Sequence, residues 1–301
     1  EASQKTPAMR AVLPPHWRDD VARWVRDDVP SVDVGGLVVG DRVVTATLWG
    51  KSDGVLAGVP FFEWTFEALG GGCTVEWLVD EGARVEASTA PGGKVAVATV
   101  TGPARLLLLG ERTALNTLAR ASGVATAART ARAAVPATWR GAVAGTRKTT
   151  PGFRIVEKYA LLVGGCATHR LDLSQMVMLK DNHVWAAGSI AEACRVAKAV
   201  AGFSSKVEIE CRDFAEACEA CDAGADIVML DNYGPEDLKV EAKRLKAKYP
   251  HVLIEASGGI TIDTLPLYVS DDVDIVSMGS LTQGYATVDF SLKLPKPADA
   301  P

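Results

Sequence analysis

Chemically active residue types stand at the ends of short apolar segments in the second half of the chain. In order they are Arg147 and Lys148, Lys180, Glu210, Asp231, Ser257-Gly258-Gly259 and Gly279. If the segments are parallel strands joined by helices, their carboxyl ends meet at one edge, where the active sites of β/α barrels lie. We therefore predict one site to which all of these residues contribute.

The region that begins this series is basic, although the chain as a whole is acidic. The 301 residues contain 32 basic and 37 acidic side chains, a net charge of −5, which argues against a general nucleic-acid binder. Residues 147–180 nevertheless hold more basic than acidic side chains, and His169 adds a hydrogen-bond donor beside Arg170. A local cationic cluster on an acidic chain indicates a small polyanion held in a cleft.

The remaining strand-end residues suit a phosphorylated sugar and a metal ion. Glycines in Ser257-Gly258-Gly259 let backbone N–H groups approach a phosphate closely, and Gly279 stands at the corresponding place one unit later. Glu210 and Asp231 offer oxygen ligands to Mg²⁺, or negative charge to a sugar ring that becomes positive during reaction. We therefore expect these two acids to act on the sugar, the metal or both.

Six short apolar segments are predicted to be the strands that position these residues. They are residues 141–147, 176–180, 207–210, 227–231, 252–257 and 275–279. Residues 214–221 and 235–249 have helical patterns between them, so the order is β-α-β-α and the strands are parallel. Six such units favour a closed barrel, and no G-x-G-x-x-G follows the first strand to suggest a dinucleotide-binding fold.

The first part of the chain has the pattern of a small α+β domain. Residues 43–49 and 94–100 alternate between apolar and polar side chains, which is typical of half-buried strands. A turn signal at Lys51-Ser52-Asp53-Gly54 predicts that residues 55–59 return as the hairpin partner of the first strand.

Two helices complete the expected elements. One spans residues 16–29, and a longer one, interrupted at Gly123, spans 111–134. We place the domains at residues 1–115 and 116–285, followed by a C-terminal segment, 286–301.

The six cysteines show no pattern of a disulfide framework or of a zinc site. Cys218 and Cys221 form a C-x-x-C in the predicted helix, but no second pair completes a metal set. We expect them to be small residues on one helical face, in a reducing, cytoplasmic compartment. No apolar run reaches membrane-spanning length and no signal-peptide pattern is seen, so no membrane association is expected.

Longer motifs run in a fixed order through nearly the whole chain. They are Gly110-Glu111-Arg112, Gly145-Thr146-Arg147-Lys148-Thr149-Thr150-Pro151-Gly152-Phe153-Arg154, His169-Arg170, Lys180-Asp181-Asn182-His183, Glu208-Ile209-Glu210, Leu230-Asp231-Asn232 and Glu255-Ala256-Ser257-Gly258-Gly259-Ile260. Together they resemble the quinolinate phosphoribosyltransferases, also called nicotinate-nucleotide pyrophosphorylases (carboxylating).

The resemblance implies an α/β fold of the type II phosphoribosyltransferases. This fold has an N-terminal α/β sandwich domain and an incomplete parallel α/β barrel, with the C-terminal segment returning toward the first domain. The implied reaction transfers phosphoribose from phosphoribosyl pyrophosphate to quinolinate, with Mg²⁺ as cofactor. Its products are nicotinate mononucleotide, pyrophosphate and carbon dioxide, a step of NAD biosynthesis. The implied catalytic unit is a homodimer, and assembly as far as a hexamer is left open.

The resemblance also implies a role for each candidate residue. The pyridine dicarboxylate would be held by Arg147, His169, Arg170 and Lys180, with Lys148 at the same pocket. Glu210 and Asp231 would face the ribose and the metal. The 5-phosphate would be bound by Ser257, Gly258, Gly259 and Gly279. Arg112 would reach into the neighbouring subunit's site, and the residues expected to be catalytic are Lys148, Lys180, Glu210 and Asp231.

Some residues separate this chain from part of the family, and two other functions fit some of the same residues. Cys166 and Thr168 replace a glycine and an asparagine that bacterial-type members usually have, so the chain is closer to the eukaryotic subtype. Lys180 at a strand end would also suit the Schiff-base lysine of a class I aldolase. A non-enzymatic phospho-ligand-binding protein would not need Glu210 or Asp231.

Overall fold

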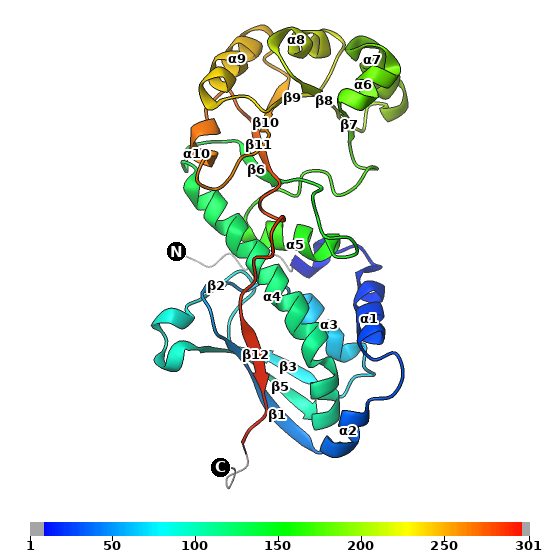
Figure 1. Cartoon of the computed structure of the whole chain (residues 1–301), viewed down its shortest axis with the longest axis vertical. Coiled ribbons are helices and arrows are strands. Elements are labelled where there is room, and N and C mark those ends of the chain that lie inside the picture. Colours follow the sequence, from blue (N-terminus) through cyan, green and yellow to red (C-terminus); the bar gives the residue numbers. More distant parts are fainter. Residues whose placement is uncertain (1–8, 297–301) are drawn as a thin grey trace. The chain divides into compact units, whose positions relative to one another are not determined.

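A computed structural model describes residues 9–296, which divide into two compact units (Figure 1). Unit 1 consists of the chain up to Arg129, Thr150–Gly165 and the chain from Tyr285 onward. Unit 2 consists of Thr130–Thr149 and Cys166–Gly284. The boundary predicted near residue 115 falls inside helix α4 (Ala104–Ala134), whose residues belong partly to each unit.

Unit 1 is built on an antiparallel sheet with the strand order β12-β1-β5-β3. Its strands are β1 (Val43–Gly50), β3 (Thr74–Trp77), β5 (Val95–Pro103) and β12 (Phe290–Lys293). The helices of this unit besides α4 are α1 (Trp17–Asp28), α2 (Val34–Val39), α3 (Val59–Glu67) and α5 (Arg154–Gly164). Leu48, Val97, Phe62 and Leu118 meet in one buried core, to which β12 adds Phe290.

The predicted hairpin after the first strand is wrong. β1 pairs with β5 and β12, whereas the residues after the turn form β2 (Gly54–Val55), which pairs with β4 (Arg84–Val85). Gly58 then takes a left-handed conformation, and α3 begins at Val59 with Pro60 in its first turn. A proline at this position suits a helix start and cannot donate to a sheet ladder, so the local sequence favours α3 over a longer strand.

The long helix is confirmed and is uninterrupted at Gly123. A Cβ added at this residue would lie 1.9 Å from the Ala286 carbonyl oxygen. The glycine is therefore a place of close backbone approach, where the chain leading to β12 passes over α4. Glycine lowers helix stability here by about 1 kcal/mol relative to alanine, but alanine would clash with the Ala286 carbonyl.

Unit 2 is a six-stranded parallel sheet with the order β6-β11-β10-β9-β8-β7. Its strands are β6 (Ala142–Gly145), β7 (Val177–Leu179), β8 (Val207–Cys211), β9 (Ile227–Asp231), β10 (Leu253–Ser257) and β11 (Ile275–Met278). All six predicted segments are confirmed as strands, with ends that shift by no more than two residues. Helices α6 (Asp181–Ala187), α7 (Ile190–Ala201), α8 (Phe214–Asp222) and α9 (Pro235–Lys248) lie along one side of the sheet (Figure 1).

The prediction of a closed barrel is wrong, and the incomplete barrel implied by the resemblance is confirmed. Strands β6 and β7 are the two edges of the sheet and do not pair with each other. Instead, the chain before β7 meets β6 in a single parallel bridge between Ala144 and Ala167. The helix that follows β6 in sequence, α5, belongs to unit 1. The sheet therefore lacks the β/α units that closure needs.

The predicted C-x-x-C helix is confirmed as α8, in which Cys221 is buried and Cys218 is half-buried. Burial raises the pKa of the Cys221 thiol to about 12. Within residues 9–296, no helix combines the length and the apolar character needed to cross a bilayer.

Glu81 is a carboxyl group of unit 1 held against the N-terminus of α3. Its Oε1 accepts from the Gly58 N–H at 2.8 Å and its Oε2 from the Val59 N–H at 3.0 Å. Burial nevertheless raises the pKa of this carboxyl to about 7, against the lowering effect of these N–H groups. The folded protein therefore holds a proton here that the unfolded chain releases at lower pH.

We predict that Glu81 makes the protein less stable as the pH rises from about 4.5 to about 7. A folded pKa above the unfolded value of 4.5 adds stability below 4.5 that is lost as the pH passes the folded pKa, by about 3 kcal/mol for this difference. Glu81→Gln should flatten this slope in denaturant unfolding at a series of pH values. The exposed Glu86→Gln is the control and should leave the slope unchanged. Equal slopes in wild type and Glu81→Gln would contradict the prediction.

Candidate active site

The carboxyl ends of the unit 2 strands surround a cavity of about 490 Å³, which we call the strand-end pocket. Its lining residues are Thr146, Arg147, Lys148, His169, Arg170, Met178, Lys180, Glu210, Met229, Asp231, Asn232, Glu255, Ser257, Gly258, Gly259 and Ser277. Ten of the twelve residues predicted for the site are among them, so the structure brings these ten together around one cavity.

Strand register brings the acids into the pocket. Glu210 on β8 and Glu255 on β10 both pair with Met229 of β9, so the three residues lie at one level across the sheet. Asp231 pairs with Ser257 one step nearer the strand ends. Because strand side chains alternate between faces, Glu208 shares the face of Glu210 but lies deeper in the sheet.

Arg147 and Arg170 bring two positive charges into the same pocket. The Arg147 Nε is buried and has no hydrogen-bond partner in the described chain. Burial lowers the pKa of Arg170, and the nearby charge of Arg147 lowers it further. Two guanidinium groups that repel each other, one with an unsatisfied buried donor, form a site that an anion would stabilise.

Opposite charges are already matched at the other side of the pocket. Lys180 forms an ion pair with Glu210. Burial raises the pKa of Asp231, and the neighbouring charge of Glu210 raises it further, against the opposite effects of Lys180 and Lys148. The two acids on β8 and β9 therefore repel each other, and a cation beside them would relieve this repulsion.

The glycine turn after β10 needs a left-handed backbone. Gly258 has φ +102° and Gly259 φ +61°. A Cβ at Gly258 would lie 2.6 Å from the Asn232 nitrogen, whereas one at Gly259 would meet nothing within 4 Å. Asn232 is itself left-handed, at φ +60°, and donates its N–H to the Ser257 carbonyl at 2.9 Å. The turn is packed on the Asn232 side and open at Gly259.

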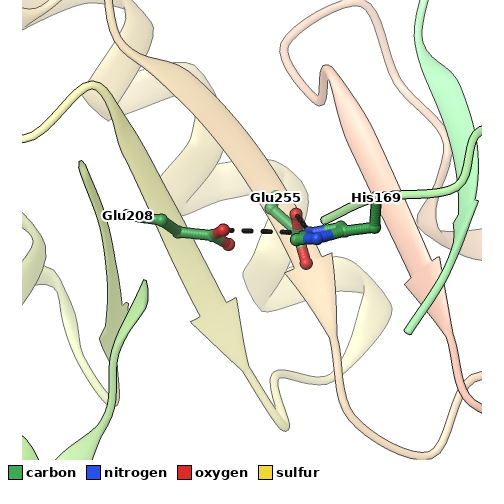
Figure 2. A group of neighbouring side chains, drawn as sticks. All are labelled: His169, Glu208 and Glu255. Atoms are coloured by element: carbon green, nitrogen blue, oxygen red, sulfur yellow. Dashed lines mark hydrogen bonds and ion pairs between the residues drawn. The ribbon is translucent and has the colours of Figure 1, made fainter. Parts of the chain in front are cut away.

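His169, Glu208 and Glu255 form a cluster at the inner end of the pocket (Figure 2). The His169 Nε2 lies 2.8 Å from Oε2 of Glu255 and 3.8 Å from Oε2 of Glu208. Both glutamate side chains are 0% exposed, and the His169 side chain is 8% exposed. Burial raises the pKa of Glu208 to about 9, and the charge of Glu255 contributes to this rise.

Two predicted residues do not line the strand-end pocket. Gly279 lies next to it, where a Cβ would come 2.9 Å from Cδ of Lys148. Thr282 holds the same lysine by donating its hydroxyl to the Lys148 carbonyl at 2.8 Å. Arg112 is exposed in α4 and lines a different cavity, of about 470 Å³, formed by residues of unit 1.

Three residues of this region had no role predicted from the sequence: the buried acids Glu208 and Glu255, and Asn232. A function for the two acids could have been inferred from their position, because each stands in an otherwise apolar strand at a place that should be buried. Asn232 carried a signal as well, since asparagine tolerates the left-handed region better than most residues. All three stand within motifs that carried the family resemblance.

Comparison with solved structures defines the class of this protein. The structure resembles NadC from Streptococcus pyogenes with a TM-score of 0.83 and 37% identity, over 93% of this chain and 97% of that one. It resembles the nicotinate-nucleotide pyrophosphorylase from Francisella tularensis with the same TM-score and 30% identity, over 92% and 97% of the two chains. The chain therefore has the fold of the nicotinate-nucleotide pyrophosphorylases, a class of phosphoribosyltransferases.

Sequence comparison defines the family. The quinolinate phosphoribosyl transferase N-terminal domain matches residues 32–122, and the C-terminal domain of the same name matches 124–293. A nicotinate-nucleotide pyrophosphorylase [carboxylating] from Rattus norvegicus is 52% identical over 97% of this chain and 96% of its own length. The one from Homo sapiens is 54% identical over 91% and 90%. The chain belongs to the quinolinate phosphoribosyltransferase family, as its motifs predicted.

We predict that the two glycines of the turn differ in their tolerance of alanine. Gly259→Ala should lose only the cost of a left-handed alanine, about 1 kcal/mol, or a Tm lower by about 2–4 °C. Gly258→Ala adds a clash with the Asn232 backbone, so its Tm should fall by at least twice as much. Thermal unfolding of both variants measures the difference. Equal losses would show that the approach to Asn232 does not constrain the turn.

Proposed function

We propose that the strand-end pocket transfers phosphoribose from phosphoribosyl pyrophosphate to quinolinate and releases carbon dioxide. The products are nicotinate mononucleotide and pyrophosphate, and the reaction is a step in NAD biosynthesis. The observation that carries this proposal is that Arg147 and Arg170 line one pocket, in which the buried Nε of Arg147 has no hydrogen-bond partner in the described chain. A guanidinium pair of this kind fits a dicarboxylate, because each plane can bind one carboxylate through two N–H groups.

The two substrates would occupy different sides of the pocket. Quinolinate lies on the side of Arg147 and Arg170, with Lys148 and Lys180 beside it. The 5-phosphate of the sugar lies at the glycine turn, where Gly259 leaves open space and backbone N–H groups can face an anion. Between them, Glu210 and Asp231 face the ribose.

Mg²⁺ is the metal that we propose for this site. The fit rests on the donors, because Glu210 and Asp231 are carboxylates on adjacent strands that repel each other, and Mg²⁺ prefers oxygen ligands. When bound, the ion would neutralise charge on the pyrophosphate leaving group. Lys148 and Lys180 would act on the same leaving group from the chain's own side.

The reaction needs positioning and electrostatics, and it needs no enzyme nucleophile. The bond between the anomeric carbon and pyrophosphate breaks, the electron pair leaves with pyrophosphate, and the ribose becomes positive. Glu210 and Asp231 stabilise this charge, as carboxylates do in glycoside chemistry. The pyridine nitrogen then forms the new bond to the anomeric carbon, held there by the arginines. The resulting pyridinium accepts the electrons of the adjacent carboxylate bond, carbon dioxide leaves, and the ring carbon takes a proton.

The ion pair of Lys180 weighs against the aldolase alternative. A Schiff base needs a free neutral amine, and the Lys180 amine is engaged in an ion pair with Glu210. Membership of an enzyme family likewise weighs against a binding protein without activity.

We propose a homodimer as the catalytic unit, in which Arg112 serves the partner's quinolinate site. The support is that Arg112 is exposed on α4 and lines a cavity other than the strand-end pocket of its own chain. We also propose the cytoplasm as the compartment, because all six cysteines are free thiols.

The proposed reaction predicts which products form, and the proposed metal predicts that their formation depends on Mg²⁺. Quinolinate labelled with ¹³C in the carboxylate next to the ring nitrogen should give labelled carbon dioxide and unlabelled nicotinate mononucleotide by mass spectrometry. Chelation of Mg²⁺ should stop both, and added Mg²⁺ should restore them. Asp231→Asn should lower turnover by about 10²-fold or more, whereas the exposed Asp271→Asn should not. Product without Mg²⁺ would contradict the metal, and no product would contradict the reaction.

A shared site predicts complementation between two inactive variants. Arg112→Ala and Lys180→Ala should each be inactive, and a mixed dimer of the two should contain one site with both residues intact. Random pairing would restore about a quarter of wild-type activity if sites act independently. Each variant reassembled with itself is the control. No recovery, with mixed dimers proven by native mass spectrometry, would place Arg112 outside the partner's site.

A further inference from the structure

Both ring nitrogens of His169 already have partners within the protein. The backbone N–H of Arg170 donates to Nδ1 at 2.9 Å, and Nε2 lies 2.8 Å from Oε2 of Glu255 (Figure 2). A backbone N–H can only donate, so Nδ1 must accept and carries no proton. The ring proton is therefore on Nε2, which donates it to Glu255.

This arrangement fixes both the charge and the chemistry of the ring. A second proton would have to sit on Nδ1, where it would face the Arg170 N–H, so the bridged ring is a neutral imidazole. A metal ion at Nε2 is disfavoured for the same reason, because a metal-bound histidine donates its other N–H, and here Nδ1 accepts. His169 and Glu255 are therefore joined by one proton, and neither ring nitrogen remains for a substrate carboxylate.

The bridge holds a strained piece of backbone in place. His169 has φ +53°, in the left-handed region, which costs a residue with a Cβ about 1–2 kcal/mol. Its ring connects Glu255, fixed in the central strand β10, to the backbone N–H of the next residue. That residue is Arg170, whose guanidinium reaches Met176 O at 3.4 Å beside the pocket. The direction in which Arg170 leaves the chain thus depends on the position of the His169 ring.

Glu255 depends on the same bridge. Its side chain is 0% exposed, its Oε2 accepts from His169, and the Glu208 carboxyl group lies beside it. A buried carboxylate is costly unless a donor satisfies it. His169 and Glu255 therefore hold each other in place.

We propose that His169 and Glu255 are positioning residues for Arg170, and that His169 is not itself a ligand of the substrate dicarboxylate. The proposal rests on the proposed function, because it takes Arg170 to bind quinolinate. It assigns the neutral imidazole a structural task in the pocket and leaves recognition of the anion to the guanidinium groups.

The first test reads the ring directly and needs no turnover. ¹⁵N-labelled histidine in the full-length protein at pH 7 gives signals for its four histidines, and His169→Asn identifies those of His169. We expect Nδ1 to resonate as an unprotonated nitrogen and Nε2 as an N–H, with and without quinolinate. A proton on Nδ1, in either condition, would overturn the proposal.

The second test separates positioning from binding by kinetics. Glu255→Leu removes the acceptor and should raise the KM for quinolinate by about tenfold or more, with the KM for phosphoribosyl pyrophosphate within about twofold. Glu255→Gln keeps an oxygen that can accept from Nε2 and should restore most of the affinity. Arg170→Lys measures the loss expected when the proposed ligand itself is changed.

Each kinetic outcome bears on one proposal. Equal increases in both KM values for Glu255→Leu, or an unchanged KM for quinolinate, would overturn the positioning role. Failure of Glu255→Gln to recover affinity would overturn it as well. If wild-type protein forms no product from quinolinate, the proposed function fails, and the ¹⁵N signals of the ring still decide whether the neutral bridge exists.

Discussion

The crowding of like charges at one edge of the parallel sheet is the constraint on which this site depends. The register places Glu210 and Glu255 at one level, and the loops at the same edge add Arg147 and Arg170. In a partly buried pocket each of these charges interacts more strongly than it would in water. The protein matches some of these charges internally, and the buried Nε of Arg147, which has no hydrogen-bond partner in the described chain, is a donor that a bound anion can satisfy.

The acids show how this selection works. Glu210 is matched by Lys180 and Glu255 by the N–H of His169. Burial raises the pKa of Glu208 to about 9, so near neutral pH it adds little negative charge beneath the pocket. A substrate with several negative charges therefore meets the buried Nε of Arg147, which has no hydrogen-bond partner in the described chain, with Arg170 beside it.

The sequence predicted those parts of the fold that depend on local pattern. The ranges of β8, β9 and β10 follow from short apolar runs, and the shared edge follows from the direction of parallel strands. The open sheet did not follow, because closure depends on whether α5 covers the sheet or belongs to unit 1, and its helical pattern is the same in both cases. The failed hairpin has a similar cause, since β1 takes its partners from residues far away in the chain.

The site residues were predictable where a charged side chain stands at the end of a strand, as Arg147, Lys180 and Asp231 do. Glu208 and Glu255 stand inside apolar strands, and the sequence does not show which residue contacts a buried acid there. The partner of Glu255 is His169, which also lies near Glu208 and is far from both in the chain. A single bridge at Ala167 holds the loop that carries His169 against β6. A histidine next to an arginine suggests two ligands for one anion. The hydrogen bonds of the ring change that interpretation. Nδ1 accepts from the Arg170 N–H and so cannot donate to a substrate carboxylate, and the proton on Nε2 is donated to Glu255.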